Sequence, residues 1–116
     1  MEKDKYTIRQ AKISDAVKIR DCLKTWLQEA PFNFGNINNS KILENIIFYI
    51  KHNFVIVLEK ENIIVGTLAA TIDDTWYSDK KFLRTLWLHV HPKHRSYTAF
   101  RAIMLVLKEY AAKNNL

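Results

Sequence analysis

Apolar residues recur with a helical period in three parts of the chain. Over residues 14–31 they return every three or four positions, which predicts a helix with Ser14 as its N-cap and Pro31 at its end. The same spacing predicts a second helix over 40–50, capped by Ser40, and a third from about residue 98 to residue 113. A loop containing Phe32 and Phe34 separates the first two helices.

The remaining apolar segments are short and β-branched, as in strands. They cover residues 6–9, 54–58, 63–72 and 82–90, and the turn at 60–62 joins the second and third strands into a hairpin. The predicted order is β-α-α-β-β-β-α. We therefore expect an α+β fold with a mostly antiparallel sheet and helices packed against it.

Length and composition narrow the class of protein. A chain of 116 residues with 48% hydrophobic residues suits a single domain, 1–116. The longest apolar run, at 102–107, is far shorter than the roughly 20 residues of a membrane span. The charged N-terminus has no apolar segment of the kind found in secretory signals, so we expect a cytoplasmic protein. The single cysteine, Cys22, excludes an internal disulfide and is expected to be a buried, inert thiol.

The segment 86–95 joins a strand to a helix through the basic turn His91-Pro92-Lys93-His94-Arg95. The first amides of a helix have no partner within it and lie at the positive end of its dipole. Such a junction can bind an anion. The formal net charge of +6 is compatible with an anionic ligand such as a nucleotide cofactor.

These motifs resemble those of the GNAT family of acyl-CoA N-acyltransferases. The resemblance rests on the opening 6–15, on Ile64-Val65-Gly66-Thr67-Leu68, and on the Val-His-Pro-x-x-Arg run that ends at Arg95. It covers nearly the whole chain and implies a GNAT-like fold. It also implies that the protein binds acetyl-CoA and transfers acetyl to an amine.

The resemblance assigns a cofactor site to the strand-to-helix junction. In the family an Arg-x-x-Gly-x-Gly/Ala loop binds the pyrophosphate through its amides, and the preceding strand orients the pantetheine. Here Thr98 and Phe100 stand where the family has glycine. The residues expected to bind acetyl-CoA are Val90, Arg95, Ser96, Tyr97, Thr98, Ala99 and Phe100.

Other residues are candidates for the acceptor side. His89 is the candidate catalytic residue, because an imidazole can take a proton from an ammonium and this face of the strand would line the family's active site. Packing in the core is its alternative role. We expect Phe32, Phe34, Asp73 and Trp76 to contact the acceptor, with Tyr77 and Trp87 in the same aromatic wall or, for Trp87, in the core. His89, His91 and His94 have no carboxylate near them in sequence, so no metal site is expected.

The family pattern continues beyond what these residues contain. Members have a further strand and helix, and usually a closing strand, after the helix that ends here near Lys113. The chain could be a piece of a longer protein, a half completed by a partner strand, or a reduced fold without catalysis. The alternative function is a non-catalytic module that dimerises or docks a partner through the open edge of strand 82–90. The basic residues lack the interleaved aromatics of RNA-binding motifs, which argues against nucleic acid.

Overall fold

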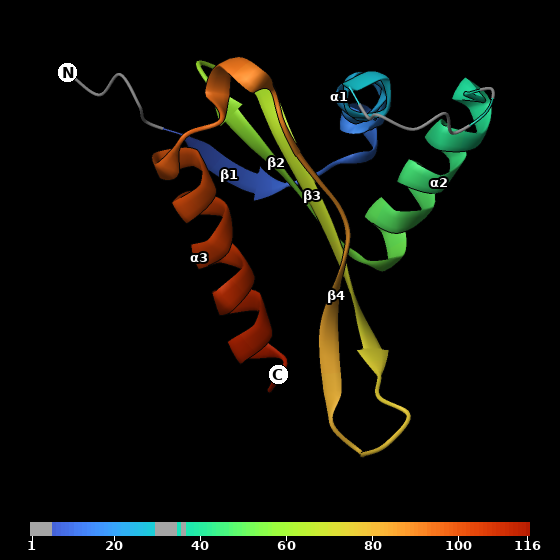
Figure 1. The fold of residues 1–116 in the computed structure, drawn as a ribbon, viewed down its shortest axis with the longest axis vertical. Helices are drawn as coiled ribbons and strands as arrows, with labels where there is room; N and C mark the ends of the chain where they lie inside the picture. The colour runs from blue at the N-terminus through green and yellow to red at the C-terminus, as the bar shows by residue number, and fades with distance from the viewer. Residues whose placement is uncertain (1–5, 30–34, 36) are drawn as a thin grey trace.

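The computed structural model describes residues 6–29, 35 and 37–116, and it forms three layers (Figure 1). A four-stranded sheet lies between helices α1 and α2 on one face and helix α3 on the other (Figure 1). The strands are β1 (Thr7–Gln10), β2 (Phe54–Lys60), β3 (Ile63–Asp74) and β4 (Lys81–Val90), and the helices are α1 (Ala16–Glu29), α2 (Asn39–His52) and α3 (Tyr97–Lys113). The predicted element order and α+β class are confirmed.

The strands lie in the sheet in their sequence order, β1-β2-β3-β4, and every pairing is antiparallel. Strand β2 is central and buried from Phe54 to Leu58, which explains its unbroken apolar run. The β2–β3 turn is tight because Glu61 and Asn62 both adopt positive φ. One bulge follows Leu58 on the β2–β3 ladder, and another leaves Leu86 without a register partner on β3.

Two apolar clusters hold the layers together. Ile19, Leu23 and Ile46 of the α1–α2 layer pack on one face of the sheet with Val57 and Trp87. On the other face, Ala99 and Ile103 of α3 pack against the sheet. Their partners on the strands include Ile56, Leu58 and Leu68. Trp87 is 8% exposed and its indole N–H donates to Thr67 Oγ1, so its core role is confirmed.

Two predicted helix caps are wrong. Ser14 lies inside a short 3-10 turn, Ile13–Asp15, where the Asp15 carboxylate accepts the Lys12 amide at 2.7 Å. Asn38 caps α2 by accepting the Lys41 amide, which leaves Ser40 within the helix. Aspartate and asparagine are good capping residues, and each lies close in sequence to the serine we had expected in that role.

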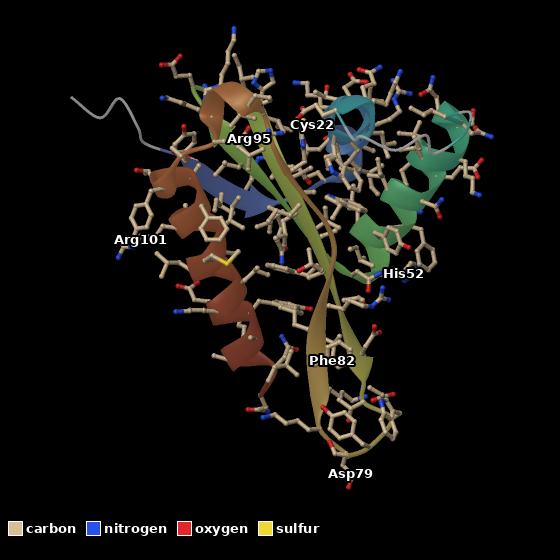
Figure 2. All side chains as sticks on the ribbon, in the orientation of Figure 1. Cys22, His52, Asp79, Phe82, Arg95 and Arg101 are labelled. Carbon is tan, nitrogen blue, oxygen red and sulfur yellow. The ribbon has the colours of Figure 1, made fainter. Side chains whose placement is uncertain are left out.

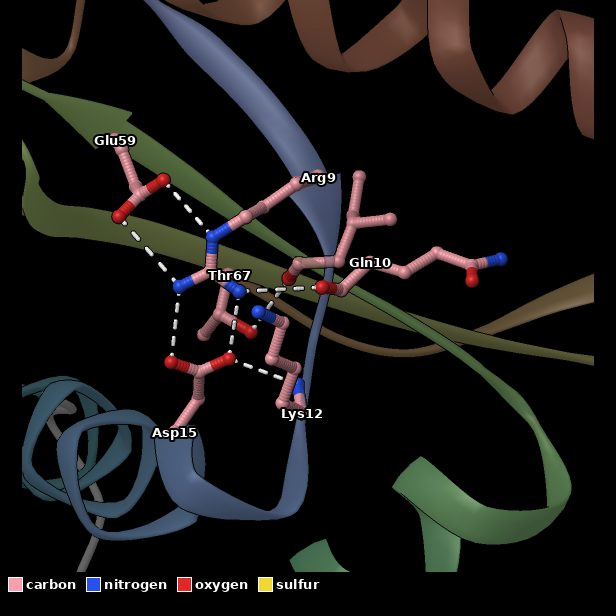
Figure 3. Close-up of polar contacts among 7 residues, drawn as sticks. Arg9, Gln10, Lys12, Asp15, Glu59 and Thr67 are labelled. Carbon is pink, nitrogen blue, oxygen red and sulfur yellow. Dashed lines mark hydrogen bonds and ion pairs between the residues drawn. The ribbon is translucent and has the colours of Figure 1, made fainter.

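An ion-pair network joins β1, β2 and the turn before α1 (Figure 3). The Arg9 guanidinium donates to Asp15 at 2.7 and 2.9 Å and to Glu59 Oε1 at 2.9 Å (Figure 3). Hydrogen bonding to Arg9 holds the pKa of Asp15 below its ordinary value, although burial acts against it. The network fixes the short edge strand β1 to the start of α1.

Candidate functional site at the β4–α3 junction

Strand β4 ends beside β3 at a place where the two backbones come unusually close. Gly66 pairs with Val90, and a Cβ at Gly66 would lie 3.1 Å from the His89 carbonyl oxygen. The His91 amide then donates to the Val65 carbonyl at 2.7 Å, which extends the pairing past the strand end. The 3-10 turn Pro92–His94 follows and delivers the chain to α3.

The start of α3 offers unpaired backbone donors. The Ser96 side chain caps the helix by accepting the Ala99 amide, and the Phe100 amide donates to the Ser96 carbonyl. The amides of Tyr97 and Thr98, in the first turn, have no acceptor among the described residues. These two amides and the helix dipole could bind an anionic group.

A cleft of about 510 Å³, which we call the β4–α3 cleft, opens in front of this helix start. Six of the seven residues expected to bind acetyl-CoA line it: Val90, Arg95, Ser96, Tyr97, Ala99 and Phe100. Trp26, Leu88, His89 and Ile103 complete the lining. Thr98 lies apart from it, in a smaller hollow with Arg101 and Leu105.

Phe100 is directed toward the cleft and not into the core. Its side chain is 52% exposed, and two other residues of the lining, Trp26 and Leu88, are 42% and 39% exposed. The cleft is therefore mostly apolar, with aromatic side chains from both α1 and α3. Trp26 lines the cleft although its spacing along α1 matches that of the buried Ile19 and Leu23.

Arg95 binds the protein itself. Its Nε donates to the Val90 carbonyl at 2.7 Å, and its Nη2 donates to Glu29 Oε2 at 3.0 Å. The guanidinium thus connects the end of α1 to the end of β4. This contact assigns Arg95 a positioning role at the cleft, and Glu29, which we did not predict, shares it.

His89 is buried at the inner end of the cleft, with 4% of its surface exposed. Neither of its ring nitrogens has a hydrogen-bond partner among the described residues. Burial lowers the pKa of His89, with the charges of Arg95 and His91 acting in the same direction and Glu29 against them. The imidazole is therefore neutral at physiological pH and able to accept a proton.

The acceptor residues expected from sequence are not brought to this cleft. Asp73 pairs with Phe82 in the register, whereas Gly66 pairs with Val90, so they lie at opposite ends of the hairpin, roughly 25 Å apart along the strands. Trp76 is 95% exposed in the β3–β4 turn. Figure 2 shows Arg95 at one end of the hairpin and Asp79 at the other. Phe32 and Phe34 lie outside the described residues.

Neither a metal site nor a membrane-spanning helix is found in the part of the chain that the structure describes. No group of three His, Cys, Asp or Glu side chains within residues 6–29, 35 and 37–116 has the arrangement of a metal site. No helix in the same part of the chain is long and apolar enough to span a membrane.

Several solved structures share this fold at low sequence identity. An acetyltransferase from Clostridium acetobutylicum, described as predicted and solved with acetyl-CoA, has a TM-score of 0.80 and 17% identity over 97% of this chain and 77% of its own. A GNAT family acetyltransferase from Staphylococcus aureus has a TM-score of 0.73 and 18% identity, covering 95% of this chain and 80% of its own. An integron cassette protein from the Cole Harbour Salt Marsh metagenome reaches 0.83 with 14% identity, covering 94% and 72%.

No protein-family model and no curated protein matches the sequence. At identities below 25% the structural likeness establishes the fold. The chain therefore has the GNAT-like acyltransferase fold that its own motifs resemble.

Proposed function

We propose that the protein is an N-acetyltransferase that binds acetyl-CoA in the β4–α3 cleft and transfers acetyl to an amine. The observation that supports it most is His89, a buried and unpartnered imidazole beside an apolar cleft and a helix start. Its ring nitrogens have no hydrogen-bond partner among the described residues, so they are free to exchange a proton with a ligand in the cleft.

The lining of the cleft fits acetyl-CoA in its chemistry. The unpaired amide of Tyr97 suits the pyrophosphate, and Leu88, Val90 and Ile103 suit the apolar part of the pantetheine. Phe100 stands in the cleft in place of a family glycine, so its ring would pack against the ligand. When bound, acetyl-CoA supplies a thioester carbonyl that an amine can attack.

The residues of the chain then act in three ways. The α3 amides hold the anionic end, and the apolar lining packs against the pantetheine. Arg95 and Glu29 fix the end of β4 against α1 and so keep the cleft in shape. His89, neutral because it is buried, takes the proton from the amine nitrogen.

Calorimetric titration with acetyl-CoA tests the binding step with a matched pair of variants. Phe100 and Phe48 are equally exposed, at 52% and 53%, but only Phe100 lines the cleft. We expect wild type to saturate below about 1 mM, Phe100→Asp to bind at least tenfold more weakly by repelling phosphate, and Phe48→Asp to match wild type. Absence of binding at millimolar concentration, or equal affinity for Phe100→Asp, contradicts the proposal.

The proton-transfer step is tested with two histidines. His89→Gln should lower kcat/KM by about 10²-fold or more while leaving acetyl-CoA affinity within about threefold. His52→Gln, on the exposed side of α2, should leave both unchanged. A fully active His89→Gln enzyme would remove the imidazole from the mechanism.

The edge of β4 supports a second candidate function. Among the described residues β4 pairs with β3 on one side and with no strand on the other. A free strand edge can pair with a second chain, so an interaction module that dimerises through β4 is the alternative. Sedimentation analysis distinguishes them, because a monomer at about 0.1 mM that binds acetyl-CoA fits only the enzyme.

A further inference from the structure

A second cavity meets the β4–α3 cleft at His89. We call it the α1–β3 cavity; it has a volume of about 470 Å³, within the size range of small-molecule sites. His89 is the one described residue that lines both cavities. A ligand group that reaches His89 along the cleft therefore lies at the opening of a second space.

Most polar side chains of the α1–β3 cavity already have partners within the protein. These contacts join Asp21 to Arg20 at 3.5 Å, Thr25 to the Asp21 carbonyl at 3.2 Å, His91 to the Lys93 amide at 3.2 Å and His94 to the Tyr6 hydroxyl at 3.4 Å. Two further polar residues, Lys18 and Asn62, are exposed to solvent. A polar ligand gains little from groups that are already bonded or hydrated.

The surface that remains inside the cavity is mostly apolar. Ile63, Ile64 and Val65 at the start of β3 line it together with Cys22 of α1. Ile63 is 64% exposed, so the protein leaves a large aliphatic side chain uncovered there. Burial, with the charge of Asp21 adding to it, raises the pKa of the Cys22 thiol. The thiol is therefore neutral at physiological pH and belongs to the apolar lining.

An acetyl group is too small to use this space. Because His89 takes the proton from the attacking amine, the thioester carbonyl of the bound donor has to lie near His89. The acetyl methyl beyond that carbonyl occupies roughly the volume of one water, about 30 Å³. The α1–β3 cavity has a volume of about 470 Å³, so it has room for a much longer chain.

We infer that the α1–β3 cavity binds the acyl chain of a coenzyme A thioester longer than acetyl, with roughly four to eight carbons. This inference rests on the proposed binding of the thioester in the β4–α3 cleft. The carbonyl stays beside His89, and the chain extends past the imidazole onto Ile63, Ile64 and Val65. The protein then prefers medium-chain acyl groups to acetyl, because each buried methylene adds to the affinity.

Calorimetric titration with acetyl-, butyryl- and hexanoyl-CoA tests the chain site, and coenzyme A itself is the control without an acyl group. We expect hexanoyl-CoA to bind at least about tenfold more tightly than acetyl-CoA. The readout is the ratio of these two affinities, because the coenzyme A part contributes equally to both.

Two exposed aliphatic residues give a matched pair of variants. Ile63→Asp places a charge on the wall of the cavity and should bring the affinity ratio to within about threefold of one. Leu105, 48% exposed, belongs to α3 on the other face of the sheet (Figure 1). Leu105→Asp should therefore retain the wild-type ratio.

Cys22 provides a second measurement inside the cavity. It is the single cysteine of the chain, so its reaction with N-ethylmaleimide at about pH 8 can be followed by mass spectrometry. Hexanoyl-CoA at saturation should slow this reaction about fivefold or more, because the chain covers the thiol. Acetyl-CoA and coenzyme A should leave the rate within about twofold of the free protein.

The outcomes separate this inference from the proposed function. Acetyl-CoA binding with no gain for hexanoyl-CoA, or a gain that Ile63→Asp retains, overturns the acyl-chain site alone. Equal protection of Cys22 by acetyl-CoA and hexanoyl-CoA also overturns it. Absence of binding by all three thioesters overturns the proposed function and this inference together. A gain for hexanoyl-CoA that is lost in Ile63→Asp and kept in Leu105→Asp supports both.

Discussion

The two ends of the β3–β4 hairpin have the same backbone pairing and opposite surroundings. At the Gly66–Val90 end, α1 covers one face and α3 the other, so that His89 is 4% exposed (Figure 1). At the Asp74–Lys81 end the strands extend beyond the helices, and Trp76 is 95% exposed (Figure 1). The closed end has a desolvated histidine and two cavities, and the open end has surface ion pairs.

This difference shows that the strand sequence alone does not make the site. Both ends carry aromatic and charged residues, and the sequence predicts ligand contacts at both. Electrostatic interactions strengthen where water is excluded, and only one end has helices to exclude it. The same contrast predicts how substitutions at the two ends should differ.

The largest difference should come from apolar side chains. Leu68 lies beneath α3 and is 1% exposed. Leu68→Ala should lower the free energy of unfolding by about 2–5 kcal/mol, because the smaller side chain leaves a cavity. Trp76→Ala removes a larger side chain from the open end and should change stability by less than about 0.5 kcal/mol. Urea denaturation measures both. Similar losses for the two variants would mean that the open end is covered in solution.

Ion pairs should show the next largest contrast. Asp15→Asn removes the charge from a 7%-exposed carboxylate bound to Arg9, and we expect a loss of about 1.5–3 kcal/mol. Asp74→Asn, which breaks the exposed pair with Lys81, should cost less than about 1 kcal/mol. Measuring the free energy of unfolding as the pH is lowered tests the direction of the Asp15 contribution. Because the folded pKa of Asp15 is lowered, wild type should lose this stabilisation as pH falls below about 4, and Asp15→Asn should not.

His89 predicts a smaller, pH-dependent contrast. Its folded pKa lies below the ordinary 6.5, so between these two values the unfolded chain binds a proton that the folded chain does not. Stability should therefore fall as pH drops below about 6.5. In His89→Gln this part of the pH dependence should disappear, whereas exposed His52→Gln should retain it. Thermal melts between pH 5 and pH 8 make the comparison, and an unchanged profile in His89→Gln would contradict the burial argument.

The Arg95–Glu29 contact should have the smallest effect on stability. Both side chains are partly exposed, at 47% and 36%, so Glu29→Gln should cost less than about 1 kcal/mol. It should still weaken acetyl-CoA binding, because Arg95 also holds the Val90 carbonyl at the cleft. Asp73→Asn, which breaks an ion pair with Arg84 at the open end, should leave that binding unchanged. Equal binding by the two variants would show that the contact does not shape the cleft.

The periodic apolar pattern was sufficient to predict the elements and their order. The helix caps were harder, because Asp15 and Asn38 lie close to the serines that the pattern favoured. The junction at Val90–Arg95 could be located, since a strand end followed by a helix start is a local feature. The surroundings of this junction could not be predicted, because the burial of His89 depends on α1, which lies some sixty residues earlier in the chain.

Asp73 and Trp76 were expected at the site, and the sequence could not show that they lie far from it. A loop residue near an expected active strand looks like a site residue until the strand length is known. The ladder runs from Gly66–Val90 to Asp74–Lys81 with one bulge at Leu86, and this length carries both residues to the far end. The role of Arg95 was equally hidden, because its partners are a backbone carbonyl and a helix end distant in sequence.

The arrangement of strands in their sequence order has a consequence for folding. Strands β2, β3 and β4 form two successive hairpins, so their contacts are between segments close along the chain. Local contacts close small loops and form early and fast, whereas β1 must be joined to β2 across two helices. We therefore expect the β3–β4 part of the proposed site to form early, and the Arg9 network, which needs β1 beside β2, to form later.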